Sequence, residues 1–207
     1  GTKVPAFNPF RILNDPSLLE MFKTYSTGEK KIYIMAHFNH PRELTPEAIE
    51  GLNLLMKSEV SLVNQTPMVK GVNDDPEVLA ELFSKLSYIG VPPYYVFLCR
   101  PTLGNETYSV PVERGYEIFE KSRTLCSGLA KRARLVMSHE SGKIEAVGMT
   151  EDQIFFKFLR AADKINDARF MAFFRNPEAC WFDDYQEASE EFSLFASNKT
   201  CETGISS

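Results

Sequence analysis

The stretch that decides the fold runs from Val60 to Arg100 and reads VSLVNQTPMVKGVNDDPEVLAELFSKLSYIGVPPYYVFLCR. It opens with an apolar, β-branched run, and a second apolar run, PYYVFLC, precedes Arg100. Between the two runs, Asp75-Pro76-Glu77 supplies a side-chain acceptor, a first-turn proline and an acid near the positive end of a helix dipole. Apolar residues at helical spacing follow, and Gly90 ends the pattern. We therefore predict a β-α-β unit of a parallel sheet covered by helices.

Similar units extend the pattern towards both ends of the chain. The strand-like run KKIYIMAHF lies upstream, and a helix that begins near Thr45-Pro46-Glu47 separates it from Val60. Further helices are predicted from Asp15-Pro16 and from about Pro111. The strands begin near residues 31, 60 and 93, and this repeat of about 30 residues is typical of β-α units. The sequence predicts an α/β segment of a barrel or a doubly wound sheet over residues 1–133.

Polar side chains mark the ends of the predicted strands. They are His37, Asn39 and His40 after the first strand, Asn64 and Gln65 in the second, and Arg100 after the third. In parallel α/β folds the reactive groups gather where the carboxyl ends of the strands meet. We therefore expect these residues to meet at one edge of the sheet, and this is the strongest functional signal from the residues themselves.

The pattern changes past Arg134. The runs ARLVMSHESGKIEAVG, DQIFFKFLRA and RFMAFFRN are separated by turns instead of helices, which is typical of antiparallel strands. We predict a small antiparallel β extension over residues 134–180, which carries Lys143, and an acidic, flexible tail over residues 181–207.

Composition excludes several function classes. A chain of 207 residues with 43% hydrophobic residues can bury a large core. Its formal charge of -5 and the absence of a basic run argue against nucleic acid as a partner. No apolar segment is long enough to cross a bilayer. We expect a cytoplasmic homo-oligomer with a small-molecule substrate and no membrane partner, and, because Gly1 is not a natural initiator, a fragment without its upstream half.

The residues that could hold a metal are scattered. Cys99, Cys126, Cys180 and Cys201 form no CxxC or CxxxC chelate, so they are interpreted as ordinary thiols of a reducing compartment. His37 and His40 form an HxxH pair, but strand geometry points residues three apart to opposite faces. Metal ligation is therefore the weaker interpretation of this pair.

Each remaining candidate also has a structural interpretation. Gln65 could be a satisfied core amide, and Arg100 could form a surface ion pair. Lys143 could form a Schiff base or hold a phosphate, or it could be a solvated turn lysine. The adjacent Tyr94 and Tyr95 are expected to face opposite sides of their strand, with a role in the aromatic core as the default.

The segments HFNHPRELTPEAIEGLNLL, VNQTPMVKGVNDDPEVLAELFSKL, PPYYVFLC and SVPVERGYEI resemble the lysine 2,3-aminomutase family of radical S-adenosylmethionine (SAM) enzymes. The resemblance spans residues 1–148. It implies the C-terminal part of a partial (βα)6 TIM-like barrel, in which GTKVPAF would end the third strand. The family's CxxxCxxC motif is absent from the chain. The resemblance thus implies that the 4Fe-4S cluster is held upstream and that this chain alone cannot cleave SAM.

The resemblance also implies roles for particular residues. His37 and Gln65 match positions that line the SAM and cofactor pocket in the family. Tyr94 matches an aromatic residue near pyridoxal phosphate (PLP) and the substrate. Lys143 matches the PLP-binding lysine, which makes it the candidate catalytic residue.

Two departures from the family pattern bear on the substrate. The glycine run before the PLP lysine is replaced by His139-Glu140-Ser141-Gly142, which leaves less conformational freedom and less room beside a phosphate. The two acids that would pair with a lysine side chain are replaced by Met137 and Arg100. Because a cation repels an ammonium group, these departures imply a non-lysine, anionic amino-acid-like substrate bound by Arg100.

The resulting hypothesis is the C-terminal portion of an aminomutase-like radical SAM isomerase, in which a 5′-deoxyadenosyl radical abstracts hydrogen from the substrate. Lys143 would bind PLP if PLP is used. One alternative is a PLP-free radical SAM enzyme that acts on another small molecule or a peptide. The other is a non-catalytic scaffold or binding fragment.

Overall fold

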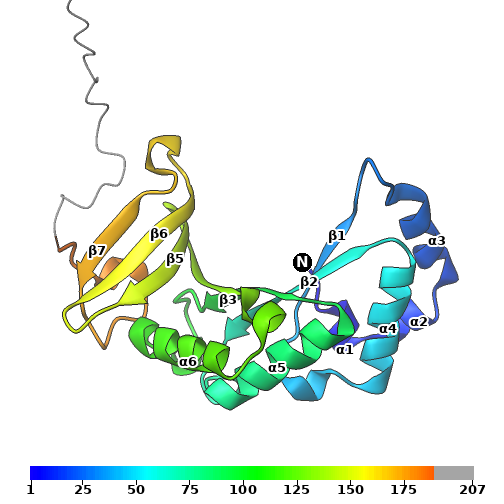
Figure 1. The fold of residues 1–207 in the computed structure, drawn as a ribbon, viewed down its shortest axis with the longest axis horizontal. Helices are drawn as coiled ribbons and strands as arrows, with labels where there is room; N and C mark the ends of the chain where they lie inside the picture. Colours follow the sequence, from blue (N-terminus) through cyan, green and yellow to red (C-terminus); the bar gives the residue numbers. More distant parts are fainter. Residues whose placement is uncertain (189–207) are drawn as a thin grey trace, which may run out of the picture.

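A computed structural model describes residues 1–188 of the chain, and a single seven-stranded sheet runs through it in the order β1 to β7. The strands are β1 (Tyr33–Ala36), β2 (Ser61–Met68), β3 (Pro93–Leu98), β4 (Arg134–His139), β5 (Gly142–Met149), β6 (Gln153–Ala161) and β7 (Phe170–Phe174). Strands β1 to β4 pair in parallel, and β4 to β7 pair antiparallel. Figure 1 shows that β1 and β7 lie towards opposite ends of a curved molecule.

Three long helices connect the parallel strands and lie on one side of the sheet (Figure 1). They are α4 (Pro46–Lys57) between β1 and β2, α5 (Pro76–Ile89) between β2 and β3, and α6 (Val112–Thr124) between β3 and β4. Three short helices, α1 (Val4–Phe7), α2 (Phe10–Leu13) and α3 (Pro16–Tyr25), precede β1. The 3-10 turns are η1 (Pro41–Glu43), η2 (Glu106–Tyr108), η3 (Gly128–Arg132), η4 (Lys164–Asn166) and η5 (Phe182–Asp184).

The helix starts form where the sequence predicts them. The side chains of Asp15, Thr45 and Asp75 accept hydrogen bonds from the first free backbone N–H groups of α3, α4 and α5. Each of these helices also has a proline in its first turn. Gly90 ends α5 with a φ of 95°, in the left-handed region that favours glycine. The predicted capping residues are confirmed.

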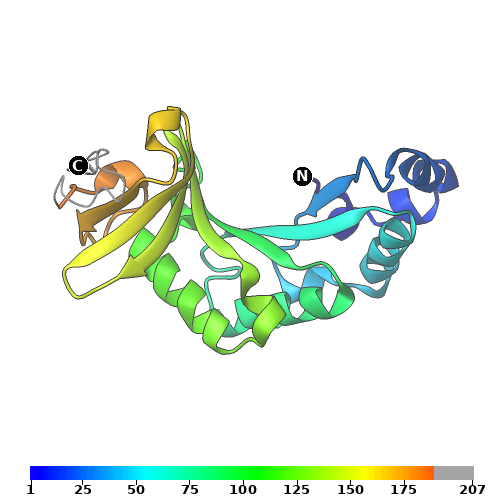
Figure 2. The same ribbon diagram turned by 45° about the horizontal axis from the view of Figure 1, so that its top comes forward.

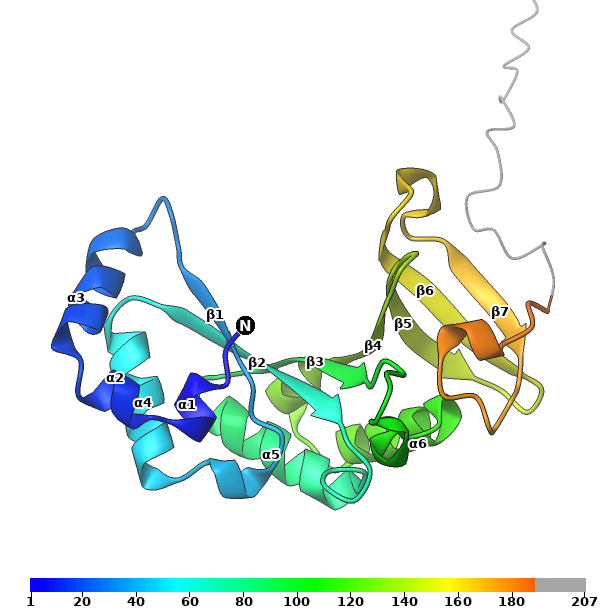
Figure 3. The same cartoon turned by 180° about the vertical axis from the view of Figure 1, so that it is seen from behind.

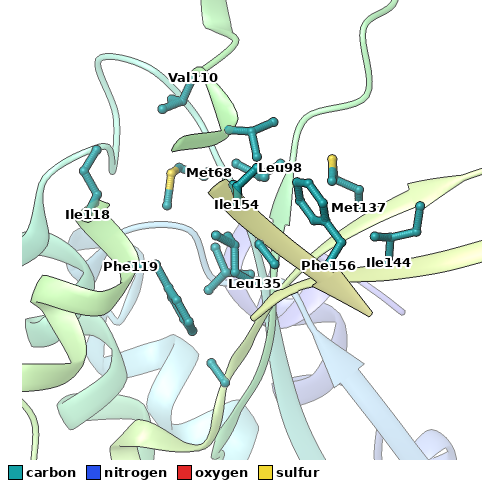
Figure 4. Close-up of a cluster of buried hydrophobic side chains, with 14 of the residues drawn as sticks. Met68, Leu98, Val110, Ile118, Phe119, Leu135, Met137, Ile144, Ile154 and Phe156 are labelled. Carbon is teal, nitrogen blue, oxygen red and sulfur yellow. The ribbon is translucent and has the colours of Figure 1, made fainter. Parts of the chain in front are cut away.

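The core lies between the sheet and the helices. Side chains from β2 to β7 and from α5 and α6 form the larger of two buried clusters, and Figure 4 shows part of it around Met68, Leu98 and Phe156. At Gly115 a Cβ atom would lie 2.6 Å from Leu98 Cδ2, so the glycine lets α6 approach β3 closely. The other cluster packs α4 and α5 against β1 and β2.

The expected barrel is confirmed only in part. The sheet is mixed, partly parallel and partly antiparallel, and residues 1–188 show no barrel. The prediction that the chain becomes antiparallel at Arg134 is wrong for the first strand, because β4 pairs in parallel with β3. The crossover through α6 and η3 returns the chain in the same direction, and the antiparallel part begins with the hairpin from β4 to β5.

Both ends of the chain also differ from the sequence-based expectation. Within GTKVPAF, only Thr2 forms a strand-like bridge, to Ala36. Val4–Phe7 is helical because Pro5 suits a first helical turn. At the other end, Trp181 and Tyr185 of the predicted tail are buried, with 7% and 8% exposure. Residues 189–207 lie outside the described part of the chain, and so does Cys201. The division into units at residues 133 and 180 stays a prediction.

Candidate functional site

The candidate residues are best described relative to the open face, the side of the sheet opposite α4, α5 and α6. Side chains alternate along β2, where Leu62, Asn64, Thr66 and Met68 are buried and the intervening residues are half-buried. Figure 2 and Figure 3 show α4, α5 and α6 below the strands, with no helix of residues 1–188 over the other side. The open face is therefore the surface on which a ligand could contact the sheet.

His37 lies directly after β1. Its backbone N–H donates to the Thr2 carbonyl at 3.0 Å, and its buried Nε2 has no hydrogen-bond partner within residues 1–188. Burial, followed by the positive charges of the Gly1 amino group and of Lys3, lowers the pKa of His37. The unpaired Nε2 is covered by Gly1, where a Cβ atom would lie 2.6 Å from it, so a hydrogen bond from His37 to a ligand stays a prediction. By contrast, His40 caps η1 by accepting a hydrogen bond from Arg42 N–H at 3.1 Å, which is a structural role.

The two amides of β2 have different roles. Asn64 Oδ1 accepts from Phe38 N–H at 2.8 Å, and its Nδ2 donates to the Phe38 carbonyl at 3.1 Å. Asn64 therefore fastens the chain after β1 to β2 on the helix side, and the expectation that it meets the other polar strand ends is wrong. Gln65 is half-buried on the open face, and no hydrogen bond of its side chain is seen within residues 1–188. Its amide is available to a ligand.

Tyr94 and Tyr95 lie on the same side of β3. Pro93 pairs with Asn64 and Tyr95 pairs with Gln65, so Tyr94 is the extra residue of a β-bulge. Their hydroxyl oxygens are 3.3 Å apart, and Tyr94 is 44% exposed. The expectation of opposite faces and of a core role for Tyr94 is wrong, because the bulge breaks the strict alternation. Burial, and then the hydrogen bond with Tyr94, raises the pKa of Tyr95 to about 12, so its phenol stays protonated.

Lys143 is the second residue of β5, and it is half-buried instead of solvated in a turn. Its Nζ lies 4.3 Å from the ring centroid of Tyr95 and 5.3 Å from that of Phe97. These contacts place the ammonium over the open face in a cation–π arrangement. The structure thus brings Lys143 together with the tyrosine pair, next to Gln65.

Arg100 lies in the loop after β3, where it is exposed. Its carbonyl accepts a hydrogen bond from Asn105 Nδ2 at 2.8 Å, and its guanidinium forms no ion pair within residues 1–188. The interpretation as a surface ion pair is therefore not supported by the described residues. A clamp for an anionic group stays a prediction.

Met137 cannot contact a ligand on the open face. It is fully buried, and Figure 4 shows it in the core with Leu135 and Phe156. The idea that Met137 stands where an acid would face a substrate ammonium is therefore wrong. The neighbouring Val136 is also fully buried and pairs with Glu145, so this position also lacks an acid.

The hairpin that replaces the glycine run is held rigidly. His139 Nδ1 lies 2.6 Å from Ser141 Oγ and accepts from Ser141 N–H at 3.1 Å. Its Nε2 lies 3.0 Å from a carboxylate oxygen of Asp183. Gly142 has a φ of 142°, and a Cβ atom there would collide with the Arg160 carbonyl. These contacts fix the backbone immediately before Lys143.

Comparison of the sequence with known proteins identifies its relatives. No family model matches the chain. The chain is 56% identical over 193 residues to a "Putative L-lysine 2,3-aminomutase" of Aquifex aeolicus, which is 93% of this chain and 52% of that protein. It is 40% identical over 128 residues to the L-lysine 2,3-aminomutase of Clostridium subterminale, with 62% of this chain and 29% of the relative covered. It is 34% identical over 142 residues to the glutamate 2,3-aminomutase of Clostridioides difficile, with 69% and 32% covered.

The chain belongs to the lysine 2,3-aminomutase family. It spans about half the length of the first of these relatives and about a third of the others. No described helix is long and apolar enough to cross a membrane.

Membership of the aminomutase family implies SAM, an iron–sulfur cluster and PLP. Within residues 1–188 no group of three or more His, Cys, Asp or Glu side chains could hold a metal ion, so the described residues do not fit the cluster. The half-buried amide of Gln65 on the open face fits a hydrogen-bonding ligand such as SAM. The half-buried amine of Lys143, beside an aromatic ring, fits PLP.

Sequence reasoning missed the charged residues around Lys143. Arg134 Nη1 lies 3.7 Å from Glu145 Oε2, and Lys157 is the strand partner of Glu145. Burial raises the pKa of Glu145, and the cations Arg134 and Lys157 oppose that shift. Alternation within GKIEAVG and QIFFKFLRA could have placed these residues on one face, because side chains two apart share a face of a strand.

Proposed function

We propose that the full-length protein is a radical SAM enzyme of the aminomutase family that acts on an anionic amino-acid-like substrate. Arg100 carries this proposal, because it is exposed after β3 and its guanidinium forms no ion pair within residues 1–188. The described open face around Lys143 supports it. Glu145, the acid facing this region, already pairs with Arg134. The family includes a relative named for glutamate, so an acidic amino acid lies within its range of substrates.

The roles of the described residues follow from their positions. When bound, SAM supplies the 5′-deoxyadenosyl radical for hydrogen abstraction, and PLP supplies an aldehyde that can hold the substrate amine. His37 and Gln65 orient SAM or the cofactor by hydrogen bonds from neighbouring strands. Lys143 would anchor PLP through Nζ, and the ring of Tyr95, 4.3 Å from this amine, would help to position it. Arg100 selects the anionic end of the substrate by charge-assisted hydrogen bonds.

The test is the formation of 5′-deoxyadenosine by the anaerobically reconstituted full-length protein. Glutamate and aspartate should stimulate its formation with SAM, and lysine should not. Stimulation by lysine alone would contradict the proposal. Sodium borohydride reduction with PLP, followed by peptide mass spectrometry, should place a pyridoxyl group on Lys143. Substrate-dependent 5′-deoxyadenosine without such a label would favour a PLP-free enzyme, and a full-length sequence without CxxxCxxC would favour a scaffold.

A further inference from the structure

The ring of His139 connects the hairpin between β4 and β5 to the 3-10 turn η5, which lies much later in the chain. Its Nδ1 accepts hydrogen bonds from Ser141 N–H at 3.1 Å and from Ser141 Oγ at 2.6 Å. Because Nδ1 accepts from a backbone N–H, the ring proton lies on Nε2. Nε2 therefore donates to the Asp183 carboxylate, at 3.0 Å. We name this contact the His139–Asp183 link.

The turn that carries Asp183 is itself held in place. The Asp184 carboxylate accepts from Trp181 N–H at 2.9 Å. The ring of Phe182 lies 5.5 Å from that of His139, whose side chain is only 8% exposed. Asp183 is therefore a fixed acceptor, although 67% of its own side chain is exposed.

The place of Lys143 in β5 makes its direction depend on the hairpin. On one side, the register with β6 shifts between Lys143 and Ile144, so the ladder is irregular at this residue. On the other side, Lys143 pairs with Ser138, and Gly142 pairs with His139. The regular pairing that directs the Lys143 side chain is therefore the end of the hairpin, to which His139 belongs.

The amine of Lys143 has few constraints of its own. Its Nζ lies near the rings of Tyr95 and Phe97, and it takes part in no ion pair within residues 1–188. A contact with a ring face restricts the direction of an ammonium less than a hydrogen bond does. The position of Nζ over Tyr95 therefore depends on where the backbone of β5 directs the side chain.

We propose that His139 and Asp183 are positioning residues for the Lys143 amine. The link fixes the end of β4, the pairing of β4 with β5 fixes the backbone at Lys143, and the amine is thereby held over Tyr95. A reactive group is held precisely when the residues that support it are fixed by hydrogen bonds of their own. This inference rests on the proposed function, in which Lys143 anchors PLP, and it assigns part of that site to a segment after β7.

NMR of the full-length protein with 13C-labelled lysine tests the position of the amine without any cofactor. Protons above an aromatic ring shift upfield, so the ε-CH2 signal of Lys143 should be displaced. Lys143→Arg identifies the signal, and Tyr95→Leu gives its position without the ring. Loss of one hydrogen bond changes a conformational population about three- to tenfold, so Asp183→Ala should remove much of the displacement. A signal that stays displaced in Asp183→Ala, or that is not displaced in the wild type, would overturn the proposal.

Conservative variants separate positioning from a general loss of stability. His139→Asn keeps an acceptor for Ser141 but is too short for Asp183, whereas His139→Gln has an amide that can reach Asp183. His139→Gln should therefore retain more of the displacement, and adding Asp183→Ala to His139→Asn should cause no further loss. Asp152→Ala removes an exposed acid at the other end of β5 and should leave the signal unchanged. Additive losses in the double variant would show that the two residues act independently, against the proposal.

Trapping with PLP tests what the position is for. After sodium borohydride reduction, Asp183→Ala and His139→Asn should carry about three- to tenfold less pyridoxyl label on Lys143 than the wild type. The background label on other lysines should not change. Wild-type labelling of Lys143 in variants that have lost the NMR displacement would overturn the positioning role. A wild-type protein without the label contradicts PLP anchoring by Lys143 and leaves the NMR result intact, so the two failures are distinguishable.

Discussion

The parallel part of the sheet, β1 to β3, and the antiparallel part, β5 to β7, present different chemistry on the same open face. The parallel part offers neutral hydrogen-bonding groups from Gln65 and Tyr95. The antiparallel part offers charged groups, among them Lys143. The proposed function assigns the two parts different roles: the parallel strands would orient a ligand through directional hydrogen bonds, and the antiparallel strands would attract its negative charge.

The two parts also differ in what stabilises them. The parallel strands are covered by α4 and α5, whereas the outer antiparallel strands depend on an aromatic cluster. Within this cluster, Phe156 contacts Phe173, Phe182 and Tyr185 with ring centroids 5.3 to 5.6 Å apart. The segment after β7 is fastened to α6 by the buried Glu113, whose Oε2 lies 2.9 Å from Arg175 Nη2. The antiparallel strands, which carry the charged side chains, are therefore stabilised by contacts with residues that follow β7.

The largest expected effect on the free energy of unfolding comes from removing Phe156, the centre of the aromatic cluster. Phe156→Ala should lower the free energy of unfolding by about 3–5 kcal/mol, because it leaves a cavity in a fully buried site. Hydrogen exchange with mass spectrometry should show loss of protection in β5 to β7 first. Phe38→Ala, which empties an equally buried site beside β1, is the matched change and should affect β1 and β2 first. The expectation is that the two parts of the sheet are stabilised separately. Equal loss of hydrogen-exchange protection in both parts, in either variant, would contradict it.

Removing Lys143 tests the chemistry of the charged part. Lys143→Ala should abolish the pyridoxyl label and lower turnover by at least about 10²-fold, the range for loss of a positioned reactive amine. Lys157→Ala removes a cation from the neighbouring strand β6 and should retain the label. Labelling of Lys143→Ala at wild-type yield would show that another lysine anchors PLP.

A smaller effect is expected at the start of α5. Asp75 caps this helix by accepting from Glu77 N–H at 2.8 Å and from Val78 N–H at 3.2 Å. Asp75→Ala should lower the free energy of unfolding by about 1 kcal/mol, measured by denaturant titration. Asp75→Asn keeps the acceptor and should recover most of the loss. No difference between the two variants would mean that the cap contributes little.

The smallest effect concerns the pH dependence of the parallel part. Because the folded protein lowers the pKa of His37, protonation favours the unfolded state. The free energy of unfolding should therefore fall as pH decreases below the ordinary histidine value of about 6.5 and through the lower folded pKa. His37→Gln should flatten this part of the profile. A profile with the same slope in wild type and His37→Gln would exclude His37 as its source.

Local features of the fold were predictable and non-local ones were not. The caps at Thr45 and Asp75 and the apolar strands depend on neighbouring residues, so the sequence shows them directly. The parallel pairing of β4, the bulge at Tyr94 and the face on which Met137 lies depend on the register with another strand. No local pattern determines that register. The same reason explains why the contact between His139 and Asp183 escaped notice, since these residues are 44 apart in the sequence.

The most direct test of the account is the substrate preference of Arg100→Asp compared with that of the wild type. The ratio of 5′-deoxyadenosine formed with glutamate to that formed with lysine should exceed one in the wild-type full-length protein. Arg100→Asp should lower the ratio at least about tenfold, because it replaces an attraction for a carboxylate by an attraction for an ammonium. A ratio that Arg100→Asp leaves unchanged would contradict the claim that Arg100 selects an anionic substrate.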